Sequence, residues 1–298
     1  MRILLTGATG FLGTYVLPKL LEQGHEVVAI VRPNREKTTP SLCNSPQLRV
    51  FEADLNSDLQ LDSFSDIDAV ITLAQEREFR RFPERASRIF NVNVSANIQI
   101  WEWASRSGVE RVVHASSGGV YGPRGGHSFS EDNLPPVDSQ NSYYLGTKLC
   151  SEIAFRSFTP YFKSAIMVRP FFIYGPGQDE DKFVQRMISY VQNRGVIDLA
   201  GPYGLRVNPI FVTDAARIFV DALSLDGQHV FNCAGNETVC LKDFCSIIGD
   251  LLDEQPVFRH SDRTPDDCVG DVELQNQFFG PPTVSLREGL QLAIEAVQ

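Results

Sequence analysis

The sequence predicts an α/β fold in which a doubly wound parallel sheet precedes a smaller C-terminal lobe. Two observations lead to this prediction. Strand-like runs alternate with segments of helical periodicity as far as Arg169, and the first of these units, residues 1–31, reads as strand, glycine turn, helix and strand. Parallel sheets built in this way bind ligands beyond the carboxyl ends of their strands. Functional residues are therefore expected directly after each strand.

The first unit begins with the β-rich run 2–6, which leads into Gly7, Gly10 and Gly13. Gly7 lets the chain turn sharply out of the strand, Gly10 leaves room for a pyrophosphate, and Gly13 lets the following helix lie close to the sheet. Unpaired N–H groups and the positive end of the helix dipole then face the phosphates. The pattern indicates a Rossmann-type dinucleotide-binding unit.

The later elements continue the alternation. Residues 34–46 read as a polar loop, and the sequence beyond Arg169 is broken by Gly-Pro pairs into short elements. We predict a dinucleotide-binding domain at 1–170, which 208–234 also joins, and a smaller substrate-binding lobe at 171–298. The expected strands are 48–52, 69–73, 111–115 and 165–169, and the clearest expected helices are 84–106 and 142–155.

Composition narrows the class of protein. A net charge of −10 argues against a nucleic-acid backbone or an anionic membrane as partner, because both favour a basic surface. The six cysteines lack CxxC spacing, so neither a zinc site nor a disulfide framework is expected, and we predict no metal. No run reaches the length of a membrane span. We expect a cytoplasmic enzyme with a small-molecule substrate.

The glycine spacing G-x-x-G-x-x-G within TGATGFLG, residues 6–13, resembles the extended short-chain dehydrogenase/reductase family, also called the NAD-dependent epimerase/dehydratase family. The resemblance implies that Thr9, Phe11 and Leu12 contact the dinucleotide together with Gly7 and Gly10. It also implies a homodimer, because relatives form a four-helix interface from the segments that correspond to the two long helices.

The residue after the second strand bears on the choice of cofactor. An acid there accepts hydrogen bonds from a ribose 2′-hydroxyl, whereas an arginine accommodates a 2′-phosphate. This chain has Arg32, which favours NADP slightly over NAD, although a solvated loop arginine is the alternative.

Three further segments are expected to contact the cofactor. Asp54 and Leu55 match the family pair near the adenine amino group, although Asp54 could instead cap the next segment. In relatives, the backbone at the positions of Leu73, Ala74 and Gln75 runs along the dinucleotide. Asn91 opens a run similar to the family's N-V-x-G-T-x-N, and Asn93 is the rival register.

Tyr144 and Lys148 are the expected catalytic pair. Four residues apart on a helix, they lie on one face. An ammonium near a phenol stabilises the phenolate, so we expect a lowered pKa for Tyr144, which would exchange a proton with a substrate hydroxyl. The resemblance implies that Lys148 also holds the nicotinamide ribose. Tyr143 is a weaker candidate, because Thr147, four residues on, supplies no charge.

A serine completes the expected constellation. Residues 116–122, Ser-Ser-Gly-Gly-Val-Tyr-Gly, are similar to the family's S-S-x-x-V-Y-G. Ser117 matches the serine that bonds the reacting oxygen, and Ser116 is the alternative candidate for this role. Ser116 is also expected to contact the cofactor. Dehydratases and decarboxylases of the family carry acids where this chain has Gly118 and Gly119. This difference leaves epimerisation, or net oxidation or reduction.

At the substrate end the resemblance is thinner. Phe171 is expected beside the nicotinamide or in the core. Phe172 stands where nucleotide-sugar enzymes have a substrate-binding asparagine, and Arg206 matches an arginine near the substrate phosphate or is an exposed strand residue. We predict an NAD(P)-dependent epimerase or oxidoreductase acting on a hydroxyl or carbonyl carbon of a sugar-like or nucleotide-sugar substrate. The alternatives are an NADPH-dependent reductase of a non-sugar ketone or aldehyde, and a non-catalytic dinucleotide-binding sensor.

Overall fold

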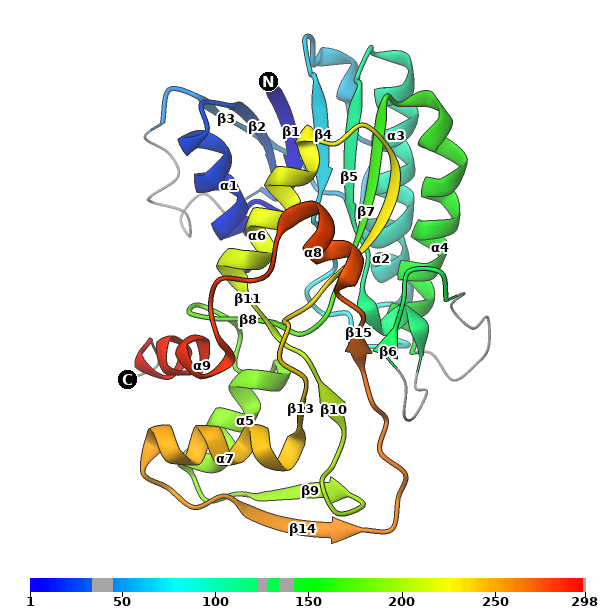
Figure 1. The fold of residues 1–298 in the computed structure, drawn as a ribbon. Helices are drawn as coiled ribbons and strands as arrows, with labels where there is room; N and C mark the ends of the chain where they lie inside the picture. Colours follow the sequence, from blue (N-terminus) through cyan, green and yellow to red (C-terminus); the bar gives the residue numbers. More distant parts are fainter. Residues whose placement is uncertain (34–44, 123–127, 134–141, 297–298) are drawn as a thin grey trace. The chain divides into compact units, whose positions relative to one another are not determined.

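The computed structural model describes residues 1–33, 45–122, 128–133 and 142–296 (Figure 1). Most of the predicted loop 34–46 lies outside these residues. The chain forms two compact units. The first comprises Met1–Val120, Pro135–Arg169 and Ala216–Phe231, and the second comprises Tyr121–Leu134, Pro170–Ala215 and Asn232–Gln298.

A seven-stranded sheet is the framework of the first unit. Its strand order is β12-β7-β5-β4-β1-β2-β3, and the pairings from β7 through β3 are parallel. The order runs outward in both directions from β1, so the predicted doubly wound fold is confirmed. The strands are β1 (Arg2–Thr6), β2 (Glu26–Val31), β3 (Leu48–Glu52), β4 (Ala69–Thr72), β5 (Arg111–Ala115), β7 (Ser164–Pro170) and β12 (Gly227–Cys233).

Helices α3 (Ala96–Arg106) and α4 (Tyr143–Phe158) pack against one face of this sheet, where Figure 1 shows them side by side. The apolar side chains of the strands, such as Leu4 and Val112, are buried there against Trp101 and Phe155. Helix α1 (Gly13–Glu22) buries Val16, Leu17 and Leu20. Burial of this apolar surface is the main stabilising contribution of the unit.

The predicted helix 84–106 contains a π-helical turn. Helix α2 (Ala86–Phe90) runs into the π turn Asn91–Ser95 and then into α3 without a break. A π turn contains an extra residue, so it changes which side chains face inward, and such turns are frequent at functional sites. Helix α4 begins one residue after Ser142, whose side chain caps it by accepting from the N–H of Leu145.

The second unit is built from short strand pairs and helices. Its described elements are β6 (Ser128–Phe129), β8 (Ile173–Tyr174), α5 (Phe183–Gln192), β9 (Val196–Ala200), β10 (Arg206–Val207), β11 (Ile210–Phe211), β13 (Val239–Cys240), α7 (Leu241–Leu252), β14 (Val257–Ser261), β15 (Val269–Gly270), α8 (Glu273–Phe279) and α9 (Leu286–Glu295); α6 (Val212–Asp221) spans the boundary of the two units. Within this unit β9 pairs with β14, and α5 packs on α7 (Figure 1). Within the described parts of the chain, none of the helices combines the length and apolarity that a membrane crossing requires.

Candidate functional site

The turn between β1 and α1 has the geometry of an anion site. Gly7 adopts φ +77°, and a Cβ at that position would lie 2.7 Å from the backbone nitrogen of Ala74. A Cβ on Gly13 would lie 2.0 Å from the carbonyl oxygen of Gly7, so the helix start can approach the turn only with glycine there. Among the described residues, no side chain caps α1 at Leu12. The helix N-terminus therefore keeps backbone N–H groups for a phosphate, which fits the pyrophosphate of a dinucleotide.

The loop that follows β4 lies against this turn. The N–H of Leu73 donates to the carbonyl of Thr6 at 3.3 Å, and the N–H of Ala74 donates to the Thr6 hydroxyl at 3.3 Å. These bonds hold Leu73 and Ala74 at the end of β1. Phe11 of the turn contacts Tyr15 of α1 edge to face.

An ion-pair cluster lies at the end of β3. Arg88 bonds both Asp54, at 3.2 Å, and the buried carboxylate of Glu76, at 2.9 Å. Burial acts to raise the pKa of Asp54, but hydrogen bonds from the N–H of Asn56 and from Arg88, together with the charge of Arg32, bring it below its ordinary value. Asp54 is thus a paired carboxylate, and sequence reasoning did not identify Arg88 as its partner.

The two candidate asparagines of the π turn have different surroundings. Asn91 donates to the side chain of Asn56 at 3.2 Å. Asn93 is fully buried; its Oδ1 accepts from the N–H of Glu76 at 2.9 Å, and its Nδ2 donates to the hydroxyl of Thr147 at 3.0 Å. Asn93 thus joins the loop after β4 to helix α4, and the choice between Asn91 and Asn93 as the cofactor contact stays a prediction.

Tyr144 and Ser117 meet at the start of α4. The Tyr144 hydroxyl donates to Oε1 of Gln75 at 2.8 Å. Burial raises the pKa of Tyr144, and its hydrogen bond with Ser117 lowers it in part. The neighbouring candidate, Tyr143, donates its hydroxyl to the carbonyl of Ala86 at 3.0 Å. Tyr144 is therefore the tyrosine that shares a hydrogen bond with the predicted serine.

Lys148 lies one turn further along α4 and is 2% exposed. Its Nζ donates to the carbonyl oxygen of Ala115 at 2.9 Å. Burial lowers the pKa of Lys148 to about 8, and the carboxylate of Glu152 opposes this decrease. The expected lowering of the Tyr144 pKa is not found, because desolvation of the phenol outweighs other effects and the ammonium bonds the end of β5.

Sequence reasoning missed a buried ionic network beneath this pair. Glu152 bonds Arg169 at 2.6 Å, and both side chains are almost fully buried. Ser116 donates its hydroxyl to the same carboxylate, so Ser116 is engaged in this network. Glu152 follows Lys148 by four residues, a spacing that places both on one face of α4 and could have identified it.

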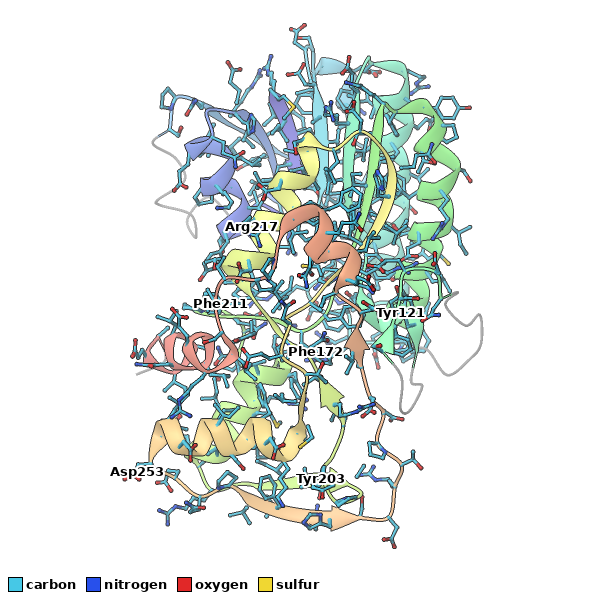
Figure 2. The ribbon with its side chains drawn as sticks, in the orientation of Figure 1. Tyr121, Phe172, Tyr203, Phe211, Arg217 and Asp253 are labelled. Carbon is cyan, nitrogen blue, oxygen red and sulfur yellow. The ribbon has the colours of Figure 1, made fainter. Side chains whose placement is uncertain are left out.

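The residues expected at the substrate end lie in the second unit. Phe171 is 1% exposed and stacks on Tyr121, and this burial fits the core alternative. Tyr121 and Phe172 are labelled in Figure 2. Phe172 adopts φ +44° and its ring contacts Phe183. Nε of Arg206 donates to Asp267 at 2.9 Å. A positive φ is costly for a phenylalanine and tends to occur where function requires it.

Comparison with known proteins decides the family. Residues 3–234 match the profile described as the NAD dependent epimerase/dehydratase family. The chain belongs to this family. A UDP-glucose 4-epimerase of Mycolicibacterium smegmatis is 33% identical over 311 residues, which cover 99% of this chain and 98% of that protein. The predicted family is confirmed, and the chain is an enzyme of the NAD dependent epimerase/dehydratase family.

Solved structures of the family agree with this assignment. MoeE5 in complex with UDP-glucuronic acid and NAD is 29% identical with a TM-score of 0.82, and the match covers 100% of this chain and 99% of that one. UDP-glucuronic acid 4-epimerase from Bacillus cereus, in complex with the same two molecules, is 25% identical with a TM-score of 0.84 and the same coverage. The fold of the chain is thus that of NAD-bound members of the family.

Proposed function

We propose that the chain is an NAD-dependent nucleotide-sugar epimerase that inverts carbon 4 of a UDP-hexose. The hydrogen bond between Tyr144 and Ser117 carries the proposal, and Tyr144 lies one helical turn before Lys148 on α4. The family match over nearly the whole chain supports it, as do the UDP-sugars named for the relatives.

The first unit offers a place for the dinucleotide. The glycine turn at Gly7 and Gly10 would hold the pyrophosphate, and Asp54 would lie near the adenine. When bound, NAD supplies a hydride acceptor that can return the hydride to the opposite face of the sugar. The second unit, with Phe172 and Arg206, would read the substrate.

Tyr144 would move the proton in both directions. In the oxidative direction its phenolate takes the proton of the substrate hydroxyl, and in the reductive direction the phenol returns it. Ser117 would donate to the same substrate oxygen. Lys148 would supply positive charge, which favours the phenolate once the substrate has excluded water.

The residues after Ser117 favour epimerisation over elimination. Gly118 and Gly119 carry no carboxylate that could expel water. A Cβ on Gly119 would lie 2.7 Å from Cδ2 of Leu145, so the position is closely packed. A dehydratase would need an acid from another element.

The choice of NAD follows the relatives rather than Arg32. The sequence alone favoured NADP slightly, but the two structures named above hold NAD. Arg32 is exposed, and its charge acts on Asp54. Titration of the parent and Arg32→Ala with NADH and NADPH tests this choice. A clear preference of the parent for NADPH, lost in the variant, would favour the reductase alternative.

A homodimer through α3 and α4 is part of the proposal. Ile153 of α4 is 57% exposed. Phe90 of α2, which continues through the π turn into α3, is 39% exposed. Side chains of this size gain stability when a second copy covers them. Sedimentation of the parent and Ile153→Glu tests it, and a monomeric parent would exclude it.

The activity assay uses purified protein, NAD and three substrates: UDP-glucose, UDP-galactose and UDP-glucuronic acid. We expect one of them to convert to its 4-epimer, detected by NMR of the sugar, with no net change in NADH absorbance. Tyr144→Phe should bind NAD and leave the sugar unchanged. Tight NAD binding without conversion of any sugar would support the sensor alternative.

A further inference from the structure

Gln75 contacts the predicted catalytic tyrosine through its side chain. The residue directly follows Ala74, is exposed, and accepts the Tyr144 hydroxyl on Oε1 at 2.8 Å. We propose that Gln75 is a positioning residue for proton transfer, whose carboxamide bonds Tyr144 in both of its protonation states. The proposal rests on the epimerase function. It assigns a role to the side chain of Gln75, whereas the sequence predicted only that the backbone of this residue lies along the cofactor.

A closed chain of hydrogen bonds fixes Gln75 against Tyr144. The next residue, Glu76, donates its N–H to Asn93, and Asn93 donates to the hydroxyl of Thr147. Thr147 in turn donates to the carbonyl oxygen of Tyr144 at 2.7 Å. The hydroxyl and the carbonyl of Tyr144 are therefore both connected to residues 75–76. This arrangement holds the backbone of Glu76 beside α4, which keeps the carboxamide of Gln75 within reach of the phenol.

The ring of Tyr144 is held as well. Phe79 packs on it with 4.4 Å between the ring centroids, and the guanidinium of Arg80 lies over Phe79 at 5.2 Å. With the ring held, the O–H bond is the part of the side chain that can still change direction. A partner at the hydroxyl therefore determines where the proton points.

The chemistry of an amide suits this position. A phenol has one proton to donate, whereas a phenolate has none and needs donors. The Gln75 carboxamide offers an oxygen to the phenol and, after rotation about its last bond, an NH₂ group to the phenolate. In the oxidative direction the substrate O–H bond breaks and the Tyr144 O–H bond forms; the reductive direction reverses both. An epimerase uses both directions in one turnover, so a partner that accepts and donates fits the reaction.

Other groups around Tyr144 stay constant when Gln75 is changed. Lys148 follows on the same helix, the Ser117 hydroxyl comes from the loop after β5, and Arg80 acts through Phe79. A change in the pH profile of Gln75 variants therefore reports on the carboxamide.

The kinetic test compares Gln75→Leu, which neither donates nor accepts, with Gln75→Glu, which accepts but does not donate. We expect kcat to fall about tenfold in Gln75→Leu, the effect of losing one hydrogen bond to a charged group. The acid limb of the kcat profile should move to higher pH in both variants, and further in Gln75→Glu because a carboxylate disfavours the phenolate. An unchanged profile in both variants would overturn the proposal, as would an equal loss at every pH with a lowered Tm.

Gln228→Leu is the matched control. Gln228 also accepts from a hydroxyl, that of Thr159 at 2.9 Å, but at the C-terminal end of α4. Its kcat and pH profile should equal those of the parent. A loss in this control similar to that in Gln75→Leu would show that any glutamine contact of α4 has the same effect, and would overturn the proposal.

A second measurement needs no turnover. Tyrosines labelled with ¹³C at the ring carbon that carries the hydroxyl give one resonance each, and the resonance lost in Tyr144→Phe identifies Tyr144. This resonance should shift in both Gln75 variants and stay in place in Gln228→Leu. If it responds to neither Gln75 variant, the role of Gln75 is refuted. A parent without epimerase activity would refute the proposed function alone, and the resonance would still decide the role of Gln75.

Discussion

Replacing Lys148 with methionine is expected to abolish turnover and, near neutral pH, to stabilise the fold. Lys148 is 2% exposed, and its ammonium has a hydrogen bond to the carbonyl of Ala115. Burial of the charge is unfavourable, which is why the pKa of Lys148 is lowered to about 8. Methionine has a similar length and carries no charge, so it can fill the same volume without this desolvation.

The size of the effect follows from the pKa. A decrease from the ordinary 10.5 to about 8 corresponds to about 3 kcal/mol of destabilisation by the charged form, at about 1.4 kcal/mol for each pH unit. Loss of the hydrogen bond to Ala115 offsets about 1 kcal/mol of that. We expect Lys148→Met to raise the free energy of unfolding at pH 7 by about 2 kcal/mol.

The pH dependence has a definite sign. Below pH 8 the folded and unfolded states both carry the Lys148 proton, so the destabilisation is fully present. Between about pH 8 and 10.5 the unfolded state holds one more proton than the folded state, and the free energy of unfolding of the parent rises with pH. The advantage of the variant should therefore shrink through this window.

Urea unfolding followed by tryptophan fluorescence measures the free energy of unfolding of the parent and of Lys148→Met at pH 7 and 9.5. Both tryptophans, Trp101 and Trp103, are buried in α3, so they report on the first unit. Lys163→Met is the control, because Lys163 is 53% exposed and its removal should change the stability little at either pH. A Lys148 variant less stable than the parent at pH 7, or a difference that is the same at pH 7 and 9.5, would refute the reasoning.

Three more predictions test other parts of the structure. Tyr144→Phe should lower kcat by about 10² to 10⁴ and leave NAD affinity within about twofold, measured by calorimetry; substantial activity would remove Tyr144 from the reaction. Gly13→Ala should lower the free energy of unfolding by about 2 kcal/mol or more, because its Cβ would lie 2.0 Å from a backbone oxygen. Gly146→Ala should raise the free energy of unfolding by about 1 kcal/mol, because a Cβ there meets nothing within 4 Å and alanine favours the helix. Equal effects of the two variants in urea unfolding would contradict this. Glu152→Gln should destabilise the first unit by about 3 kcal/mol, because Arg169 would keep a buried charge with a neutral partner; an unchanged unfolding midpoint would show that the pair contributes little.

Periodicity and turn chemistry were sufficient to predict the sheet. The strands 2–6, 26–31, 48–52 and 111–115 have the predicted bounds, because apolar β-branched runs and glycine turns are local signals. The same signals could not settle the register of Asn91 and Asn93. Both fit the motif, and the π turn that buries Asn93 depends on the contacts with Glu76 and Thr147, which lie far away in sequence.

Charge around Tyr144 was the harder prediction, since spacing shows which face a side chain occupies but not where its end group bonds. Tyr144 and Lys148 share a face of α4 as predicted, yet the phenol bonds Gln75 and the ammonium bonds Ala115. Glu152 explains how a buried lysine is tolerated there, because its carboxylate raises the pKa that burial lowers. The same carboxylate also bonds Arg169, so it is shared between two cations. The positive charge of Lys148, one helical turn from Tyr144, would favour the phenolate form when the phenol gives its proton to the substrate oxygen.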